Sequence, residues 1–313
     1  MRTTLKINKT YDTIVIGAGP AGITTAIYLS RSGADVALVE RGIYGGQLND
    51  TDSIENYTAF EEISGMELAK KMEEHSKSME GIEHIYGDVK SVEKDKEDIH
   101  VDLGKKTISG KSLVIATGVS HKKLGVTKED DLLGRGISYC ATCDGAFFKG
   151  KDVSVIGGGD SAMESAIYMS KIANSVTVIH RRKKFRAEQI LQDRAKEAEN
   201  IHYIYDADTL AFDDDGGIVS CVLYKNKKTH ENHTHPTDGV FINVGVVPNT
   251  DAFDDLGILR ESGFIYTDKE MKTSVEGIFA VGDVRYDSIR QITSAVGDGA
   301  VCSNSVNNYL NNI

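Results

Sequence analysis

The feature that most constrains the fold is an internal repeat of two glycine-rich segments that begin 140 residues apart. The segment Asp12–Gly22 has the pattern of a short apolar strand, a Gly-x-Gly-x-x-Gly turn and a helix start. The segment Asp152–Ala162 repeats this order. In both copies the residue after a second apolar strand, Glu40 or His180, lies 18 positions after the last residue of the turn. The equal spacing predicts two βαβ units of the dinucleotide-binding kind.

Further apolar strands between and after these units indicate how the chain is divided. In a βαβ unit of this kind the glycines let the backbone approach a pyrophosphate at a helix N-terminus. The pattern predicts an α/β fold with two Rossmann-like, three-layer domains, the second inserted into the first. The chain would cross between them near residues 117–120 and 244–248. We therefore expect one dinucleotide-binding domain of residues 1–117 and 247–313, and a second of residues 118–246 that also carries a Cys-x-x-Cys pair.

The two units differ at the position that distinguishes nucleotides. The first ends in Glu40, whose carboxylate suits a ribose without a 2′-phosphate, as in FAD or NAD(H). The second ends in the cationic run His180–Arg186, which suits the 2′-phosphate of NADP(H). A solvated basic face is the alternative explanation of such a run. Its place at the ribose-binding position of an acidic protein favours the phosphate site.

The chain has four cysteines, and two of them form the pair Cys140-Ala-Thr-Cys143 followed by Asp144. A structural zinc site would need about four ligands, and no second pair or histidine partner with suitable spacing is visible, so we expect no metal. Two inert buried thiols are a further alternative. Vicinal thiols at this spacing favour reversible disulfide exchange. Asp144 could supply the proton for that exchange or could be a solvated loop residue.

Composition excludes several other classes of function. The chain has 313 residues, 40% hydrophobic and 27% charged, with a formal net charge of -11. This charge argues against general nucleic-acid binding, and no apolar run is long enough to span a membrane. The sequence shows no signal-peptide pattern at its start, from which we expect a cytoplasmic protein.

At this point the motifs resemble those of a known family, the low-molecular-weight, bacterial-type thioredoxin reductases. The resemblance covers about residues 12–305 in the family's order and lies in the combination of motifs. These motifs are Gly17–Gly22, Tyr44–Leu48, Ser138–Gly145, Gly157–Ala162, His180–Arg182 with Arg186, Gly282–Arg285, Arg290-Gln291 and Gly297–Gly299. The resemblance implies that the split domain, residues 1–117 and 247–313, binds FAD and that the inserted domain, residues 118–246, binds NADPH. It also implies a homodimer that passes electrons from NADPH through FAD and a cysteine pair to thioredoxin, and we expect no nucleic acid or membrane partners. Cys143 would be the thiol nearer the flavin, Cys140 the thiol that exchanges with thioredoxin, and Asp144 the acid/base.

The resemblance also implies cofactor-binding residues, position by position. For FAD they are Gly17, Gly19, Pro20, Ala21, Gly22, Glu40, Arg41, Gly46, Gln47, Leu48, Asn56, Val89, Ala116, Thr117, Gly118, Gly282, Asp283, Arg290, Gln291 and Ile292. For NADPH they are Gly157, Gly159, Asp160, Ser161, Ala162, Glu164, His180, Arg181, Arg182, Arg186 and Gly245. Because nicotinamide and disulfide must in turn reach one flavin, the resemblance further implies that the inserted domain rotates about its two crossings, with Gly118 and Gly245 as hinges.

This chain departs from the family pattern at a few positions, and other functions stay open. Thr58-Ala59 replaces a frequent Pro-Gly, Ser165 a second Glu, and Val246 a His. The last two lie where the nicotinamide or its linker would pass, so donor preference is less firmly implied than the fold. A related flavoprotein that serves another disulfide carrier or takes electrons from ferredoxin is one alternative. A nucleotide-binding redox sensor without turnover is another.

Overall fold

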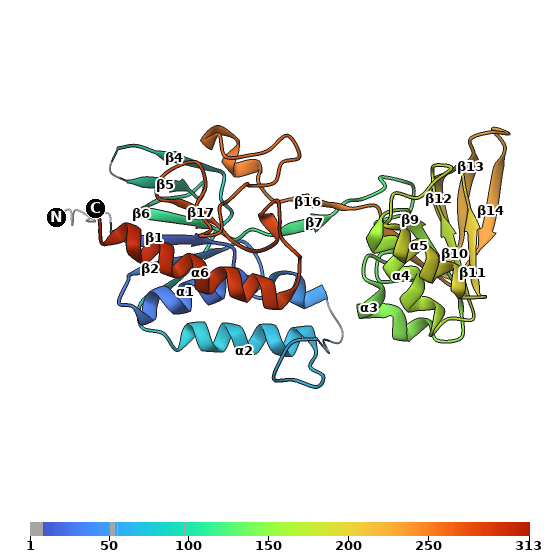
Figure 1. Ribbon diagram of the computed structural model, residues 1–313, viewed down its shortest axis with the longest axis horizontal. Coiled ribbons are helices and arrows are strands. Elements are labelled where there is room, and N and C mark those ends of the chain that lie inside the picture. The colour runs from blue at the N-terminus through green and yellow to red at the C-terminus, as the bar shows by residue number, and fades with distance from the viewer. Residues whose placement is uncertain (1–8, 51–53, 55, 97) are drawn as a thin grey trace. The chain divides into compact units, whose positions relative to one another are not determined.

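The structure is a computed structural model that describes residues 9–50, 54, 56–96 and 98–313 (Figure 1). The described residues divide into two compact units. The first contains the chain up to Ser120 together with Val247–Ile313, and the second contains His121–Val246. The chain passes between them along β7 (Val119–His121) and β16 (Val246–Pro248), which pair as a two-stranded sheet. The α/β class with two Rossmann-like folds is confirmed.

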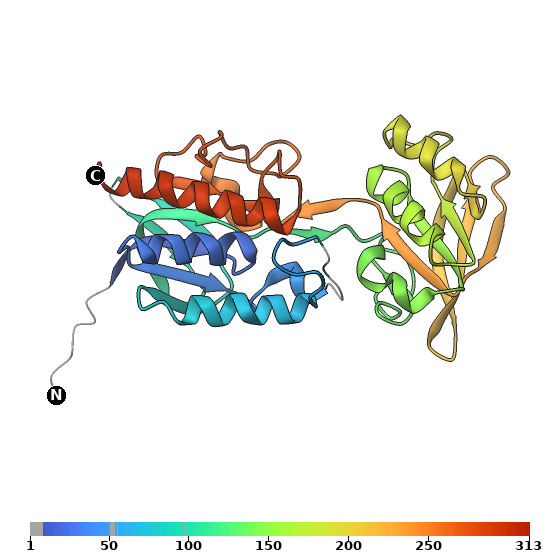
Figure 2. The same ribbon diagram turned by 60° about the horizontal axis from the view of Figure 1, so that its bottom comes forward.

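The first unit is built on a seven-stranded sheet. Its parallel strands are β3 (Ile82–Tyr86), β2 (Val36–Glu40), β1 (Thr10–Ile16), β6 (Thr107–Ile115) and β17 (Ile278–Ala280). The first part of β6 pairs with the antiparallel β5 (Ile99–Asp102), which continues to β4 (Ser91–Lys94), and its last part pairs with β17. Helices α1 (Pro20–Arg31), α2 (Gly65–Lys77) and α6 (Ile292–Leu310) lie together on one face of the sheet (Figures 1 and 2). Short 3-10 helices are η1 (Gly46–Asp50), η3 (Asp251–Leu256) and η4 (Gly282–Val284).

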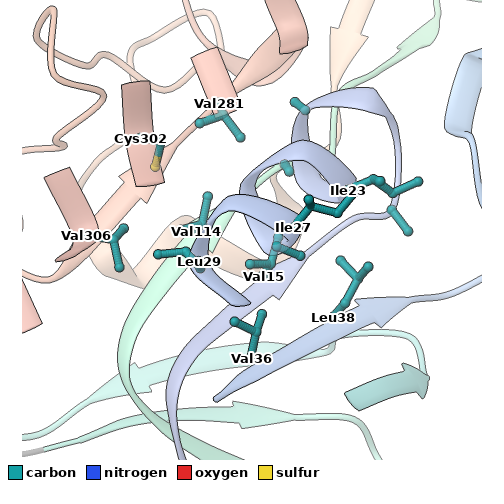
Figure 3. Close-up of a cluster of buried hydrophobic side chains, with 14 of the residues drawn as sticks. Val15, Ile23, Ile27, Leu29, Val36, Leu38, Val114, Val281, Cys302 and Val306 are labelled. Atoms are coloured by element: carbon teal, nitrogen blue, oxygen red, sulfur yellow. The ribbon is translucent and has the colours of Figure 1, made fainter. Parts of the chain in front are cut away.

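The core of this unit follows the alternation of side chains along its strands. Val15, Val36 and Leu38 are fully buried on the helix side, where they pack with α1 and α6 (Figure 3). Ile14 and the residues that alternate with this set pack on the opposite face, against β4, β5 and η3. α6 can approach α1 closely because residue 299 is glycine: a Cβ there would lie 2.7 Å from the Ala21 carbonyl oxygen. The result is a three-layer arrangement.

The second unit has a five-stranded parallel sheet in the order β11-β10-β9-β15-β8. These strands are Ile201–Ile204, Ser175–Ile179, Asp152–Gly157, Gly239–Asn243 and Ile137–Ser138, respectively. Helices α3 (Ala141–Asp144), α4 (Asp160–Ser170) and α5 (Gln189–Glu197) and the 3-10 helix η2 (Gly145–Phe148) complete its helical part. An antiparallel sheet of β12 (Ala207–Asp215), β13 (Ile218–Asn226) and β14 (Asn232–Pro236) forms a further layer that the repeat did not indicate.

Two hydrophobic clusters hold the second unit together. One packs α4 and α5 on the parallel sheet and includes Met163 and Phe241. The other joins the opposite face of that sheet to β12 and β13 through Phe212 and Val222. The parallel strands are therefore buried on both faces, as expected from their continuous apolar sequences. Among the described residues, no helix is long and apolar enough to cross a membrane.

Candidate functional site

The first glycine turn forms a cradle at the N-terminus of α1. A Cβ on Gly22 would lie 1.9 Å from the Gly17 carbonyl oxygen, so only glycine lets the helix start this close to β1. A Cβ on Gly19 would meet no atom within 4 Å, and Gly19 caps α1 without a side-chain hydrogen bond. The helix N-terminus therefore presents backbone N–H groups to open space, which fits the pyrophosphate of a dinucleotide.

Glu40 lies at the end of β2, beside this turn. Its Oε2 accepts a hydrogen bond from the Ala18 N–H at 2.8 Å, and its Oε1 accepts one from the Gly42 N–H at 2.8 Å. Each carboxylate oxygen keeps a lone pair for a further donor. The two backbone bonds hold the carboxylate in one orientation, which fits a ribose with free hydroxyls and would repel a 2′-phosphate.

Other residues expected at FAD come from distant segments of the first unit. The Asn56 side-chain amide donates to Gln291 Oε1 at 3.2 Å, and the Gln47 amide donates to the Val119 carbonyl at 2.7 Å. Arg290 has a left-handed backbone (φ 58°), and its guanidinium stacks over the Phe264 ring at 5.1 Å. Two of the residues expected at FAD, Leu48 and Ala116, are buried core residues. Others have accessible atoms: Arg41 and Gly46 are exposed, and Pro20, Val89, Thr117, Gly118 and Ile292 are part-buried.

Asp283 is the expected flavin-site residue whose ionisation is most affected by its surroundings. It follows Gly282 at the end of β17, and burial raises the pKa of its carboxyl, while Arg290 and a hydrogen bond from Ser288 act in the opposite direction. A buried carboxylate needs hydrogen-bond donors, and the hydroxyl groups of a flavin's ribityl chain would supply them.

In the second unit the repeated turn forms a similar cradle at α4. A Cβ on Gly159 would meet no atom within 4 Å, and no side chain caps the helix there. A Cβ on Gly158 would lie 2.2 Å from the His180 ring, so this ring packs directly beneath the turn. His180 is 5% exposed, its Nε2 hydrogen-bonds to the Lys184 carbonyl at 3.0 Å, and burial lowers its pKa. His180 therefore supports the turn and the cationic loop as a neutral side chain.

The loop that follows β10 is fixed against the glycine turn by its backbone. The Arg186 N–H donates to the Gly158 carbonyl at 2.7 Å, and the Glu188 N–H donates to Asp160 Oδ1 at 2.7 Å. Arg181, Arg182 and Arg186 are exposed, and in the described part of the chain no carboxylate pairs with them. Ser161 and Glu164 are exposed on the first turns of α4, while Ala162 is buried. These free guanidinium groups fit the 2′-phosphate of NADP(H).

The cysteine pair follows β8: Cys140 lies directly before α3, and Cys143 lies on it. Cys140 is disulfide-bonded, and its backbone N–H donates to Ser138 Oγ at 3.0 Å. The side chain of Cys143 lies outside the described part of the structure, and Asp144 is part-buried on the last turn of α3. Cys221 and Cys302 are free. In the described ranges no group of three or more His, Cys, Asp or Glu side chains could hold a metal ion.

Several contacts around these sites were not anticipated from the sequence. Asp298 Oδ2 accepts hydrogen bonds from the Gly282 N–H at 3.0 Å and from Arg285 Nη1 at 2.7 Å, so it holds the turn that carries Asp283. The side chain of Asn249 hydrogen-bonds to the Thr117 carbonyl at 2.9 Å, beside the first crossing. The Gly297–Gly299 motif marked the segment containing Asp298 but not its partners. No local sequence pattern pointed to this contact of Asn249.

The two glycine turns, the carboxylate at one and the cationic loop at the other, and the Cys-x-x-Cys segment define a disulfide oxidoreductase with two dinucleotide-binding folds. Residues 11–299 match the pattern of the family described as "Pyridine nucleotide-disulphide oxidoreductase". A thioredoxin reductase of Bacillus subtilis is 47% identical over 302 residues, which are 96% of this chain and 95% of that protein.

Solved structures agree with this match. A thioredoxin reductase of Streptococcus pyogenes aligns with a TM-score of 0.81 at 46% identity over 98% of this chain and 100% of that one. A thioredoxin reductase of Lactococcus lactis aligns with a TM-score of 0.79 at 44% identity over 97% of this chain and 100% of that one. The chain therefore belongs to the pyridine nucleotide-disulphide oxidoreductase family and, within it, to the thioredoxin reductases, as the sequence motifs predicted.

Proposed function

We propose that this chain reduces the disulfide of thioredoxin with electrons from NADPH, using FAD bound in the first unit and a Cys140–Cys143 disulfide in the second. The observation that carries the proposal is that the second unit contains both a free arginine loop at its glycine turn and the disulfide-bonded Cys140. A donor site and an acceptor site thus belong to the same unit. When bound, FAD supplies the exchange between a two-electron hydride donor and a dithiol.

Different residues of the chain would bind the two cofactors. The N-terminus of α1 and Glu40 would hold the pyrophosphate and ribose of FAD, and Asp283 would accept hydrogen bonds from its ribityl hydroxyls. The N-terminus of α4 would hold the pyrophosphate of NADPH, with the guanidinium groups of Arg181, Arg182 and Arg186 on its 2′-phosphate.

The exchange step uses the reduced cysteine pair. The Cys140 thiolate would attack one sulfur of the thioredoxin disulfide, which forms a mixed disulfide and releases the other sulfur as a thiolate. The Cys143 thiolate would then attack Cys140, which releases the second sulfur of thioredoxin and restores the Cys140–Cys143 disulfide. Asp144 would deliver a proton to a leaving thiolate. Two electrons thus leave the cysteine pair and reduce one thioredoxin.

The two cofactor-binding domains, a homodimer and a cytoplasmic location are part of this proposal. The domain bounds rest on the internal repeat, and the homodimer rests on the resemblance to the family. In this proposal the nicotinamide and the disulfide would both belong to the second unit, which would present them in turn to the flavin through rotation at Gly118 and Gly245. Both glycines have positive φ, 62° and 111°, and a Cβ at either would meet no atom within 4 Å. The positive φ, and not a lack of space, explains why glycine stands at both positions.

Anaerobic titration of the purified protein with NADPH, with and without thioredoxin, tests the proposal. We expect a flavin absorbance spectrum that NADPH bleaches and that oxidised thioredoxin restores. Reduction by ferredoxin but not by NADPH, or recovery with another disulfide carrier but not with thioredoxin, would instead support a related carrier reductase. NADPH binding without turnover of any disulfide would support a sensor.

A further inference from the structure

The sheet of the second unit changes direction between β9 and β15. From β9 the chain builds outward through β10 to β11, and β15 is then added on the other side of β9. Ligands of open α/β sheets bind outside the carboxyl ends of the strands at such a switch point. The residues that end β9 and β15 are therefore placed to contact a nucleotide.

These two strand ends are Gly157 and Asn243, which are register partners. Gly157 begins the glycine turn, and a Cβ on it would lie 2.3 Å from the Asn243 carbonyl oxygen, so the two backbones touch. Asn243 shares a strand face with Phe241, which packs against α4. This places the Asn243 side chain on the face of the sheet from which α4 begins.

The side-chain oxygen of Asn243 is buried without a partner. Its Oδ1 accepts no hydrogen bond from any described residue. Other buried atoms without a hydrogen bond, in the described part, are His84 Nε2, Tyr203 Oη and Asp206 Oδ2, and none of them is on β9 or β15. Asp206 Oδ2 has an ion-pair partner, Lys228 Nζ, at 2.8 Å. A buried acceptor without a donor costs free energy that folding alone does not recover. At a switch point, a ligand is the natural source of that donor.

The position of the arginine loop indicates which half of a bound NADP(H) would lie near Asn243. The loop follows β10, on one side of β9, and would take the 2′-phosphate of the adenosine half. A dinucleotide that crosses the turn at Gly159 then carries its nicotinamide half toward β15. That half has hydrogen-bond donors on its ribose hydroxyls and its carboxamide.

We propose that Asn243 is a nucleotide-binding residue whose Oδ1 accepts a hydrogen bond from the nicotinamide nucleoside half of NADP(H). The inference rests on the proposed function of the second unit as the NADPH site. β8, on the other side of β15, leads into Cys140 two residues after Ser138. Asn243 thus lies on the strand between the nucleotide turn and the redox segment.

Calorimetric titration of the oxidised holoenzyme with NADP⁺ and with 2′,5′-ADP, which lacks the nicotinamide half, tests this assignment. For Asn243→Ala we expect about 3- to 10-fold weaker NADP⁺ binding, the effect of one hydrogen bond, and unchanged 2′,5′-ADP binding. Asn232→Ala, the same change at an exposed position on β14, is the matched control and should bind both as the wild type does. Asn243→Val, whose side chain suits a strand, carries the same test if the alanine variant does not fold.

A second readout separates ligand binding from a structural role. Without nucleotide, Asn243→Val should unfold at the same temperature as the wild type or higher, because it removes an unpaired buried acceptor. The analogue 3-acetylpyridine adenine dinucleotide phosphate lacks the carboxamide N–H groups and identifies the donor to Asn243. If wild type and Asn243→Ala bind this analogue equally, the donor is the carboxamide. If the variant still binds it more weakly than the wild type, the donor is a ribose hydroxyl.

Two results would overturn the inference alone while the proposed function stands. These are wild-type affinity of Asn243→Ala for NADP⁺, and equal losses for NADP⁺ and 2′,5′-ADP. If the wild-type protein bound neither compound, the assignment of the second unit as the NADPH site would fail, and this inference with it.

Discussion

Asp298 and Arg285 form an ion pair in the first unit, with 2.7 Å between Oδ2 and Nη1 and both side chains only 13% exposed. The same carboxylate oxygen accepts the Gly282 N–H, and Arg285 Nε donates to Thr267 Oγ1 at 2.8 Å. The pair thus joins α6 to the turn that carries Asp283. This contact links the stability of the unit to the geometry of its proposed flavin site.

We expect Asp298→Asn to lower both stability and FAD retention. The substitution leaves Arg285 without its charged partner, and a hydrogen bond to a charged group contributes about 1.5–3 kcal/mol. Thermal unfolding of the apoprotein and flavin release on dilution measure the two effects. Asp213→Asn removes an exposed partner of Lys128 and is the control, with a change of about 1 kcal/mol or less. Equal destabilisation by both variants would contradict the special role of Asp298.

Asp283 should show a conflict between stability and cofactor binding. Its pKa is raised by burial above the ordinary value of 3.8, so the folded apoprotein holds this proton more tightly than the unfolded chain does. Ionisation of Asp283 therefore lowers the free energy of unfolding of the apoprotein. This loss is absent below about pH 3.8, grows as pH rises, and is complete above the raised pKa. We expect Asp283→Asn to gain stability over the wild-type apoprotein as pH rises through this window, and to bind FAD about 10- to 100-fold more weakly. A stability difference that does not change with pH would disprove this account.

The arginine loop should determine the choice of electron donor. Replacing Arg181, Arg182 or Arg186 with alanine removes a charged hydrogen bond to the 2′-phosphate and should lower kcat/KM for NADPH about 10- to 100-fold. NADH, which lacks this phosphate, should be used at the wild-type rate. Steady-state kinetics with both donors checks this, and Lys149→Ala, at another exposed position of the unit, is the control. Equal losses with both donors would mean that the loop is only a basic surface.

Thiol counts should identify the redox pair. Oxidised wild-type protein, denatured without reductant, should show two thiols, Cys221 and Cys302, and four after reduction. Cys140→Ser should show three thiols under both conditions, because its former partner stays unpaired. Four thiols in the oxidised wild type would exclude the disulfide.

The same cysteine variants should separate the roles of the two thiols. In Cys143→Ser, alkylation of the thiol released from thioredoxin should trap a mixed disulfide between thioredoxin and Cys140, since no second thiol of the cysteine pair then resolves it. Cys140→Ser should give no such mixed disulfide. Both variants should fail to turn over thioredoxin. Trapping by Cys140→Ser instead would reverse the assigned roles.

Tyr139 should position the segment that carries Cys140. Its hydroxyl donates to Glu129 Oε1 at 2.9 Å, and its ring stacks on His121 at 5.1 Å. Glu129 is 2% exposed and also accepts backbone N–H bonds from residues 124–126. Tyr139→Phe should destabilise the protein by about 1–3 kcal/mol and change the alkylation rate of reduced Cys140. Tyr205→Phe, more exposed in the same unit, should have neither effect.

The sequence by itself determined the features that depend on local pattern. Apolar runs, glycine turns and their equal spacing identified both βαβ units, because each unit is built from residues close in sequence and needs glycine where backbones touch. The charge difference between Glu40 and the arginine loop was readable for the same reason, since each follows directly from a strand end. The Cys-x-x-Cys pair and the family also followed from continuous motifs.

Only the tertiary structure decided the contacts that join distant segments. Asp298 meets Arg285 and Gly282 because α6 packs beside β17, and Asn243 meets Gly157 because β15 inserts beside β9 after a long excursion through the antiparallel strands. His180 belongs to the cationic motif by sequence, yet packing turns it inward beneath Gly158, where burial keeps it neutral. Such roles depend on which strands become neighbours, and the free energy that selects those neighbours comes from burial summed over the whole unit.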